Sequence, residues 1–177
     1  MQQVLRNGAD ITAVVDLCLS REVQFVAYKA PGDCNAAVII QKSPEVIIDG
    51  NINQKFPGKG FLIAPFSKET NDTWLIRPDI VIHDTIQAHH LSELSSLPAA
   101  DDPHKNDYIN LINESIKQIN AGEFEKVVLS RVKSVRGNFR PSIARVFSAL
   151  CETYPNAFVY LFNVKGQCWT GATPEPF

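Results

Sequence analysis

The last part of the chain contains two short strand-like runs, and this stretch decides how the fold is read. Residues 157–172 read AFVYLFNVKGQCWTGA, in which an apolar run passes through Lys-Gly at 165–166 into a second run. Aromatic and β-branched residues on both sides of a glycine-containing turn predict a β-hairpin. The hairpin is followed at 173–176 by TPEP, where two prolines restrict the backbone around Glu175. The sequence therefore predicts a carboxylate held at fixed backbone geometry just past the end of a strand.

The first half of the chain is also rich in strand-like patterns. Asp10 is the predicted N-cap of a helix over 11–19, which carries apolar residues at helical spacing. Strand-like runs follow at 23–29, 36–41, 45–49, 60–66 and 73–83. Because the connections between these runs are too short for helical crossovers, we expect an antiparallel sheet.

A polar connection over 84–106 separates this β-rich half from the rest. It contains two prolines and three histidines, and the histidines have no partners at metal-ligand spacing, so no metal site is expected there. We interpret the chain as part of one domain, with a β-rich segment at 1–83, the connection, and a segment at 107–177 that carries the hairpin.

Within 107–177 the patterns predict a helix, a strand, a second helix and the hairpin, in that order. The first helix begins near residue 106 or 107 and runs to Ala121, with Gly122 as its stop and one apolar stripe made of Tyr108, Ile112, Ile116 and Ile119. The run FEKVVLSRVK at 124–133 predicts a strand. Pro141 starts the second helix, whose inward face is predicted to hold Ile143, Val146, Phe147 and Leu150.

Composition excludes several classes of function. The chain has 177 residues, of which 45% are hydrophobic and 20% are charged, and its formal net charge is −2. These values predict a soluble globular domain that binds neither nucleic acid nor a membrane surface. The cysteines, Cys18, Cys34, Cys151 and Cys168, form no CxxC pair and are interpreted as buried thiols of a reducing compartment. No signal peptide and no apolar run of membrane-spanning length is present, which favours a cytoplasmic location.

Lys126 is the first candidate for chemistry. In a strand, alternate residues share a face, which puts Lys126 with Val128 and Ser130 on the more apolar side. This side is predicted to face inward, so Lys126 is expected to be more buried than a typical lysine. A lysine there could extend to water or pair with a carboxylate, and from this strand alone that structural interpretation is favoured. The alternative is an amine whose pKa is lowered by desolvation, so that it acts as a base near neutral pH. Glu175 leaves the same choice open, between a solvated turn residue and an acid at fixed geometry.

The two motifs taken together carry a resemblance. YINLINESIKQINAGEFEKVVLSR, followed by a helix, a hairpin and WTGATPEP, resembles the chorismate-utilising enzymes and, within them, the isochorismate synthases. The resemblance is strong from Tyr108 to Glu175 and weak before it. It implies an α/β (α+β) fold, an antiparallel-sheet sandwich with helices, of which this chain holds about half.

The resemblance also implies roles for both candidates. Lys126 becomes the general base that activates water for attack at C2 of chorismate, and Glu175 becomes the general acid that protonates the departing C4 hydroxyl group. Family members that deliver ammonia usually carry glutamine in place of this lysine, so Lys126 indicates water as the nucleophile. One departure from the family is Pro176, which follows the glutamate where Arg, Leu or Met is usual.

The resemblance further implies Mg²⁺ as cofactor and a monomeric parent enzyme. The Mg²⁺ and carboxylate ligands are expected beyond Phe177, so this chain is expected to be an N-terminal fragment that is inactive by itself and prone to self-association. Two alternatives stay open: a salicylate synthase, and a non-catalytic domain that binds a partner through an open edge. The pathway served, whether menaquinone, siderophore or salicylate, is left open by the sequence.

Overall fold

The computed structural model describes residues 3–6, 10–44, 47–49, 59–65, 72–86, 104–132, 134–135 and 137–173. The chain divides into two compact units. The first unit comprises Met1–Glu93 and Phe139–Phe177, and the second comprises Leu94–Asn138. Residues 87–103, which form most of the predicted connection, lie outside the described residues.

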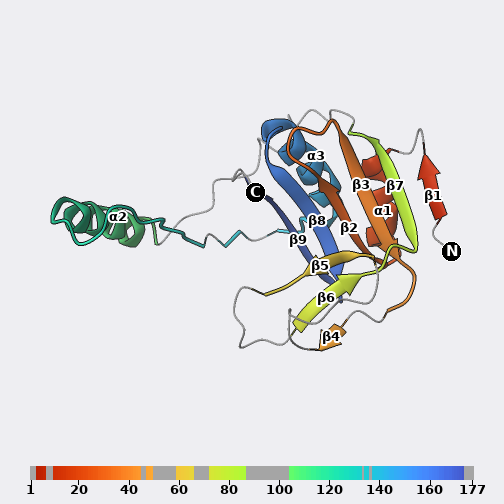
Figure 1. Cartoon of the computed structure of the whole chain (residues 1–177), viewed down its shortest axis with the longest axis horizontal. Coiled ribbons are helices and arrows are strands. Elements are labelled where there is room, and N and C mark those ends of the chain that lie inside the picture. Colours follow the sequence, from red (N-terminus) through yellow and green to blue (C-terminus); the bar gives the residue numbers. More distant parts are fainter. Residues whose placement is uncertain are drawn as a thin grey trace. The chain divides into compact units, whose positions relative to one another are not determined.

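The first unit is built from two sheets and a layer of helices (Figure 1). Its helices are α1 (Ile11–Ser20), the short 3-10 helix η2 (Arg140–Ser142) and α3 (Ile143–Thr153). Its strands are β1 (Gln3–Arg6), β2 (Gln24–Lys29), β3 (Asn35–Gln41), β4 (Ile47–Asp49), β5 (Phe61–Ile63), β6 (Asp72–Ile76), β7 (Ile80–Thr85), β8 (Phe158–Val164) and β9 (Gln167–Thr173).

The larger sheet has the strand order β1-β7-β3-β2-β8-β9, and the smaller has the order β4-β6-β5. Every pairing is antiparallel except that of β1 with β7, which is parallel. The predicted α+β class with antiparallel sheets is therefore confirmed. The predicted single run over 73–83 is wrong, because it forms β6 and β7 in different sheets. Pro78 lies in the break between them and has no backbone N–H to continue a ladder.

The larger sheet is covered on one face by helices. The core on this face is formed by α1, α3 and strands β2, β3 and β8, and it includes the fully buried side chains of Val15, Phe25, Phe147, Val159 and Leu161. Asp10 caps α1 as predicted, since its side chain accepts a hydrogen bond of 2.9 Å from the Thr12 N–H. The opposite face of the larger sheet packs against the smaller sheet through a second cluster that includes Val26, Ile76 and Phe162.

The hairpin predicted at 157–172 is confirmed as β8 and β9. The two strands are joined by Lys165 and Gly166, whose φ angles of 50° and 77° are both positive. A two-residue turn of this kind matches the right-handed twist of the flanking strands. Thr170 reinforces the pairing, because its hydroxyl group donates to the Tyr160 carbonyl at 2.9 Å.

Buried polar side chains hold the loops at both ends of the sheet. The amine of Lys29, which is 3% exposed, donates to the carbonyl oxygens of Pro155 at 2.7 Å and Ala30 at 3.2 Å. At the other end, the buried Gln41 amide donates to the Ser43 carbonyl and accepts from the Arg77 N–H. Bonds to main-chain carbonyls compensate the cost of burying these groups.

The second unit contains α2 (Lys105–Asn120) and the segment that follows it. Gly122 lies just past the helix with a φ of 78°, in agreement with its predicted role as a stop. The predicted apolar stripe is only partly confirmed, because Ile116 is exposed. Beyond the helix, the guanidinium carbon of Arg131 lies 5.2 Å from the centroid of the Tyr108 ring.

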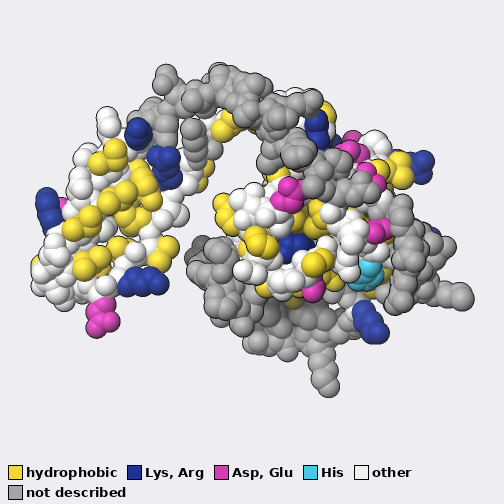
Figure 2. All heavy atoms as spheres, turned by 90° about the horizontal axis from the view of Figure 1, so that it is seen from above, with side chains coloured by type: hydrophobic (Ala, Val, Ile, Leu, Met, Phe, Trp, Pro, Cys, Tyr) yellow, Lys and Arg dark blue, Asp and Glu magenta, His cyan; other side chains and the backbone are white. Residues whose placement is uncertain are grey.

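The strand predicted over 124–133 is not formed in the described residues. Residues 124–132 have no regular secondary structure, and Val128 and Val132 are 80% and 86% exposed. Figure 2 shows hydrophobic side chains at the surface over α2 as well. A strand requires a hydrogen-bonded neighbour, and the described residues supply none to this segment.

In the part of the chain that the structure describes, the helices are too short or too polar to cross a bilayer.

Candidate functional site

One face of β8 is aromatic. Phe158, Tyr160 and Phe162 alternate with Val159 and Leu161, so the two sets point to opposite faces of the sheet. The two aliphatic side chains are fully buried beneath the helices. The ring centroids of Phe158 and Tyr160 are 6.3 Å apart, and those of Tyr160 and Phe162 are 6.0 Å apart. These distances are typical of favourable aromatic pairs, so the three rings form a continuous apolar row.

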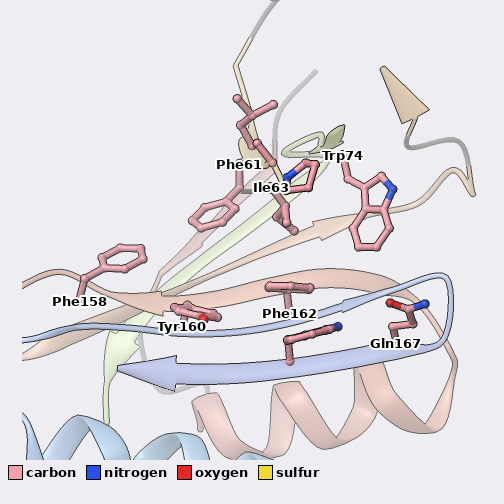
Figure 3. Close-up of a pocket in the computed structure, with 11 residues that line it drawn as sticks. Phe61, Ile63, Trp74, Phe158, Tyr160, Phe162 and Gln167 are labelled. Atoms are coloured by element: carbon pink, nitrogen blue, oxygen red, sulfur yellow. The ribbon is translucent and has the colours of Figure 1, made fainter. Parts of the chain in front are cut away.

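This row forms the floor of a groove between the two sheets. Figure 3 shows Phe158, Tyr160 and Phe162 along β8, with Phe61, Ile63 and Trp74 across from them on the smaller sheet. The cavity has a volume of about 670 Å³. Its lining consists of Phe61, Leu62, Ile63, Ala64, Pro65, Trp74, Phe158, Tyr160, Phe162, Gln167 and Trp169.

The structure explains why glycine stands at position 171 in the WTGATPEP motif. Gly171 on β9 lies directly opposite Tyr160 on β8. A Cβ atom at position 171 would lie 2.9 Å from the Tyr160 hydroxyl oxygen and 3.0 Å from the carbon that bears it. The tyrosine ring therefore occupies the space that any other residue at 171 would need.

The chemistry of the groove is apolar. None of the lining side chains that the structure describes is charged, and their polar groups are the Tyr160 hydroxyl, the Gln167 amide and the Trp169 indole N–H. The Trp74 indole nitrogen is buried without a hydrogen-bond partner among the described residues. A dianion such as chorismate requires cationic partners when it leaves water. The described part of the lining therefore suits an apolar or aromatic group.

Lys126 lies in the second unit, in the segment that follows α2, and its side chain is exposed. The prediction that Lys126 is buried on the inward face of a strand is wrong, because the segment pairs with no neighbouring strand among the described residues and so has no inward face. The assignment of Lys126 as a base rests on the resemblance alone.

Glu175 lies outside the described residues, which end in this region at Thr173. The structure therefore does not bring Lys126 and Glu175 together. The first residue of the TPEP motif is described. Thr173 is the last residue of β9 and lies opposite Phe158 at the start of β8.

The described residues do not fit a magnesium site. Among them, no group of three or more His, Cys, Asp and Glu side chains is arranged to hold a metal ion. His104 is exposed, and its ring nitrogen lies 3.5 Å from a carboxylate oxygen of Asp107 one helical turn away. His89 and His90 lie outside the described residues.

The cysteines are free thiols in the structure, as the sequence predicts. Burial raises the pKa of Cys18 to about 11 and that of Cys151 to about 12. Burial also raises the pKa of Cys168, and the nearby Arg140 guanidinium partly offsets this. Because the thiolate is the nucleophile, burial makes these three groups less reactive than an exposed thiol. Cys34 is exposed, so the prediction that it is buried is wrong.

The aromatic groove was not predicted from the sequence. The signal was present, because aromatic residues recur at every second position from Phe158 to Phe162. The pattern predicts the strand, but the apolar residues on both faces of β8 do not indicate which face meets helices and which lines a groove.

Comparison with known proteins identifies the family. A family model described as "Chorismate binding enzyme" matches residues 67–177. No significant match was found among curated proteins or among solved structures. Since the family match covers more than half of the chain and includes both sequence motifs, the chain belongs to the chorismate binding enzyme family.

Proposed function

We propose that the protein takes part in the isomerisation of chorismate to isochorismate. In this reaction a water molecule attacks C2, the ring double bonds shift, and the hydroxyl group at C4 leaves. Lys126 takes the proton from the attacking water, and Glu175 gives a proton to the departing hydroxyl group. The reaction is balanced, since one water molecule enters and one leaves.

The observation that carries this proposal is the lysine in KVVLSR at position 126. Membership of the family supports a chorismate-utilising function, and both Lys126 and Glu175 lie within the matched residues 67–177. Family members that use ammonia usually have glutamine at the position of this lysine. The lysine therefore favours water as the nucleophile.

The exposure of Lys126 adds a requirement to the proposal. A lysine acts as a base near neutral pH only when its surroundings disfavour the ammonium form, and burial is the usual cause. The described conformation exposes Lys126. The proposal therefore requires that Lys126 be covered in the catalytically competent state. Mg²⁺ is proposed as the cofactor, bound by ligands outside the described residues.

The test is a turnover assay on the full product of the reading frame, with chorismate and excess Mg²⁺, in which the products are separated by chromatography. Isochorismate is the expected product. Lys126→Ala is expected to lower kcat roughly 100-fold or more with little change in KM, because a general base acts in the transition state. Lys126→Arg keeps the positive charge but cannot accept a proton at neutral pH, so it should be as inactive. Lys105→Ala, which changes an exposed lysine on α2, is the matched control.

Each other outcome has a distinct meaning. Full activity of Lys126→Arg would show that the residue supplies charge and is not a base. Release of salicylate and pyruvate would identify the salicylate synthase alternative. Incorporation of ammonium into the product would contradict water as the nucleophile.

A non-catalytic, partner-binding domain is the second candidate. The specific observation in its favour is the uncharged aromatic groove, which suits an apolar partner. This candidate predicts that the full product of the reading frame binds chorismate no better than it binds an unrelated dicarboxylate, as isothermal titration calorimetry would show.

A further inference from the structure

The ring of Tyr160 reaches across from β8 and lies against the backbone of β9 at Gly171. A Cβ atom at position 171 would lie 2.9 Å from the Tyr160 hydroxyl oxygen and 3.3 Å from a carbon of the ring edge. The rings of Phe158 and Phe162 lie on either side of Tyr160 along β8, with centroids 6.3 Å and 6.0 Å away (Figure 3). The neighbouring rings therefore hold Tyr160 in the position from which it contacts β9.

This contact lies close to the end of β9. Thr173 is the last residue of the strand and pairs with Phe158, two positions beyond the pair of Gly171 with Tyr160. In a hairpin with a two-residue turn, every second pair from the turn exchanges both backbone hydrogen bonds, and these two pairs belong to that set. The Thr170 hydroxyl adds a bond of 2.9 Å to the Tyr160 carbonyl oxygen. The end of β9 is therefore fixed by its partners on β8.

A short and stiff connection joins this strand end to Glu175. The sequence continues from Thr173 as Pro-Glu-Pro, so Glu175 is two positions further along the chain. Two residues span at most about 7 Å. Pro174 has a fixed φ, and Pro176 restricts the backbone of the residue before it. A connection of this kind transmits a displacement of the strand end instead of absorbing it.

We propose that Tyr160 is a positioning residue for the reaction, because its ring fixes the strand end from which the segment with Glu175 continues. The inference rests on the proposed function, in which Glu175 protonates the departing hydroxyl group. A proton donor works only within hydrogen-bond distance of its acceptor, and a misplacement of about 1 Å can lower the rate roughly 100-fold. Tyr160 acts through β9 and needs no contact with the substrate.

The test compares two substitutions of Tyr160 in the turnover assay on the full product of the reading frame, with chorismate and Mg²⁺. Tyr160→Leu removes the ring but stays apolar, and it should lower kcat roughly tenfold while KM changes by less than about twofold. Tyr160→Phe keeps the ring against Gly171 and should retain kcat to within about twofold. Phe147→Leu, which removes a fully buried ring on α3, is the matched control and should leave kcat unchanged. Circular dichroism should show that all three variants are folded.

A double-mutant cycle shows whether Tyr160 acts through Glu175. In a Glu175→Gln background, Tyr160→Leu should lower kcat by less than about twofold, because no acid is left to be misplaced. An equal loss in both backgrounds would overturn the proposal, since Tyr160 would then support activity by another route.

Amide hydrogen exchange gives a measurement that does not depend on activity. In Tyr160→Leu, exchange at the amides of Gly171 and Thr173 should become roughly fivefold faster or more, whereas Gln167 at the other end of β9 should change little. Tyr160→Phe should leave all three amides unchanged. Unchanged exchange in Tyr160→Leu would overturn the proposal, because the strand end would then be fixed without the ring.

The kinetic results separate this inference from the proposed function. Isochorismate formation by the wild-type chain, with an unchanged kcat in Tyr160→Leu, would overturn the inference and leave the proposed function standing. A wild-type chain that forms no isochorismate would overturn the proposed function, and the role of Glu175 with it.

Discussion

Strand β8 and the segment 124–132 are both rich in valine and other apolar residues, but their surroundings differ. Strand β8 lies between β2 and β9, and its Val159 and Leu161 are fully buried under the helices. The segment has no neighbouring strand among the described residues, and its Val128 is 80% exposed. Apolar side chains in an extended segment stabilise a strand only when a second layer removes them from water and a neighbour bonds their backbone. The two stretches therefore differ in whether a neighbouring strand and a second layer are present among the described residues.

The largest expected effect on the free energy of unfolding comes from shortening a buried apolar side chain of β8. The same kind of change in the segment 124–132 should have almost no effect. Leu161→Ala should lower the free energy of unfolding by about 2–5 kcal/mol, because it leaves a cavity in a closed core. Val128→Ala should change it by less than about 0.5 kcal/mol, because that side chain is in water. Urea unfolding followed by circular dichroism measures both. A cost above about 1 kcal/mol for Val128→Ala would show that the segment is covered in solution.

The sequence was sufficient to predict the structure of features that depend on residues close together in the chain. Three local features depend on only a few consecutive residues, and all three were predicted correctly. They are the cap of α1 at Asp10, the hairpin turn at Lys165 and Gly166, and the helix stop at Gly122. The class of fold followed from the short connections between strands.

The sequence was insufficient where the outcome depends on distant partners. Lys126 was predicted to be buried because its neighbours alternate, but alternation does not show whether a second layer exists. The split of 73–83 into strands of two sheets, and the groove beneath Phe158 and Tyr160, likewise depend on which surfaces meet in the folded chain. The roles of Lys126 and Glu175 are still predictions.

An intermediate effect on the free energy of unfolding is expected at the contact between Gly171 and Tyr160, where a Cβ atom at position 171 would have little free space. Gly171→Ala should lower the free energy of unfolding by about 1–3 kcal/mol, because the new methyl group forces the tyrosine ring to move. In a Tyr160→Leu background, the same substitution should cost less than about 0.5 kcal/mol. Equal costs in both backgrounds, measured by urea unfolding, would show that the ring is not the obstacle.

The smallest expected effect lies in the second unit, where the contact between Tyr108 and Arg131 joins α2 to the segment that follows it. A guanidinium group over an aromatic ring at an exposed site contributes about 0.5–1 kcal/mol. Tyr108→Leu keeps an apolar side chain but removes the ring, so amide hydrogen exchange in α2 should become roughly two- to fivefold faster. Ile116→Leu, at an exposed position on the same helix, is the control and should leave exchange unchanged. Unchanged exchange in Tyr108→Leu would mean that the ring contact does not stabilise α2. A change of more than about tenfold would mean that Tyr108 is part of a larger packed core. The second unit would then be better packed than the exposure of the segment 124–132 suggests.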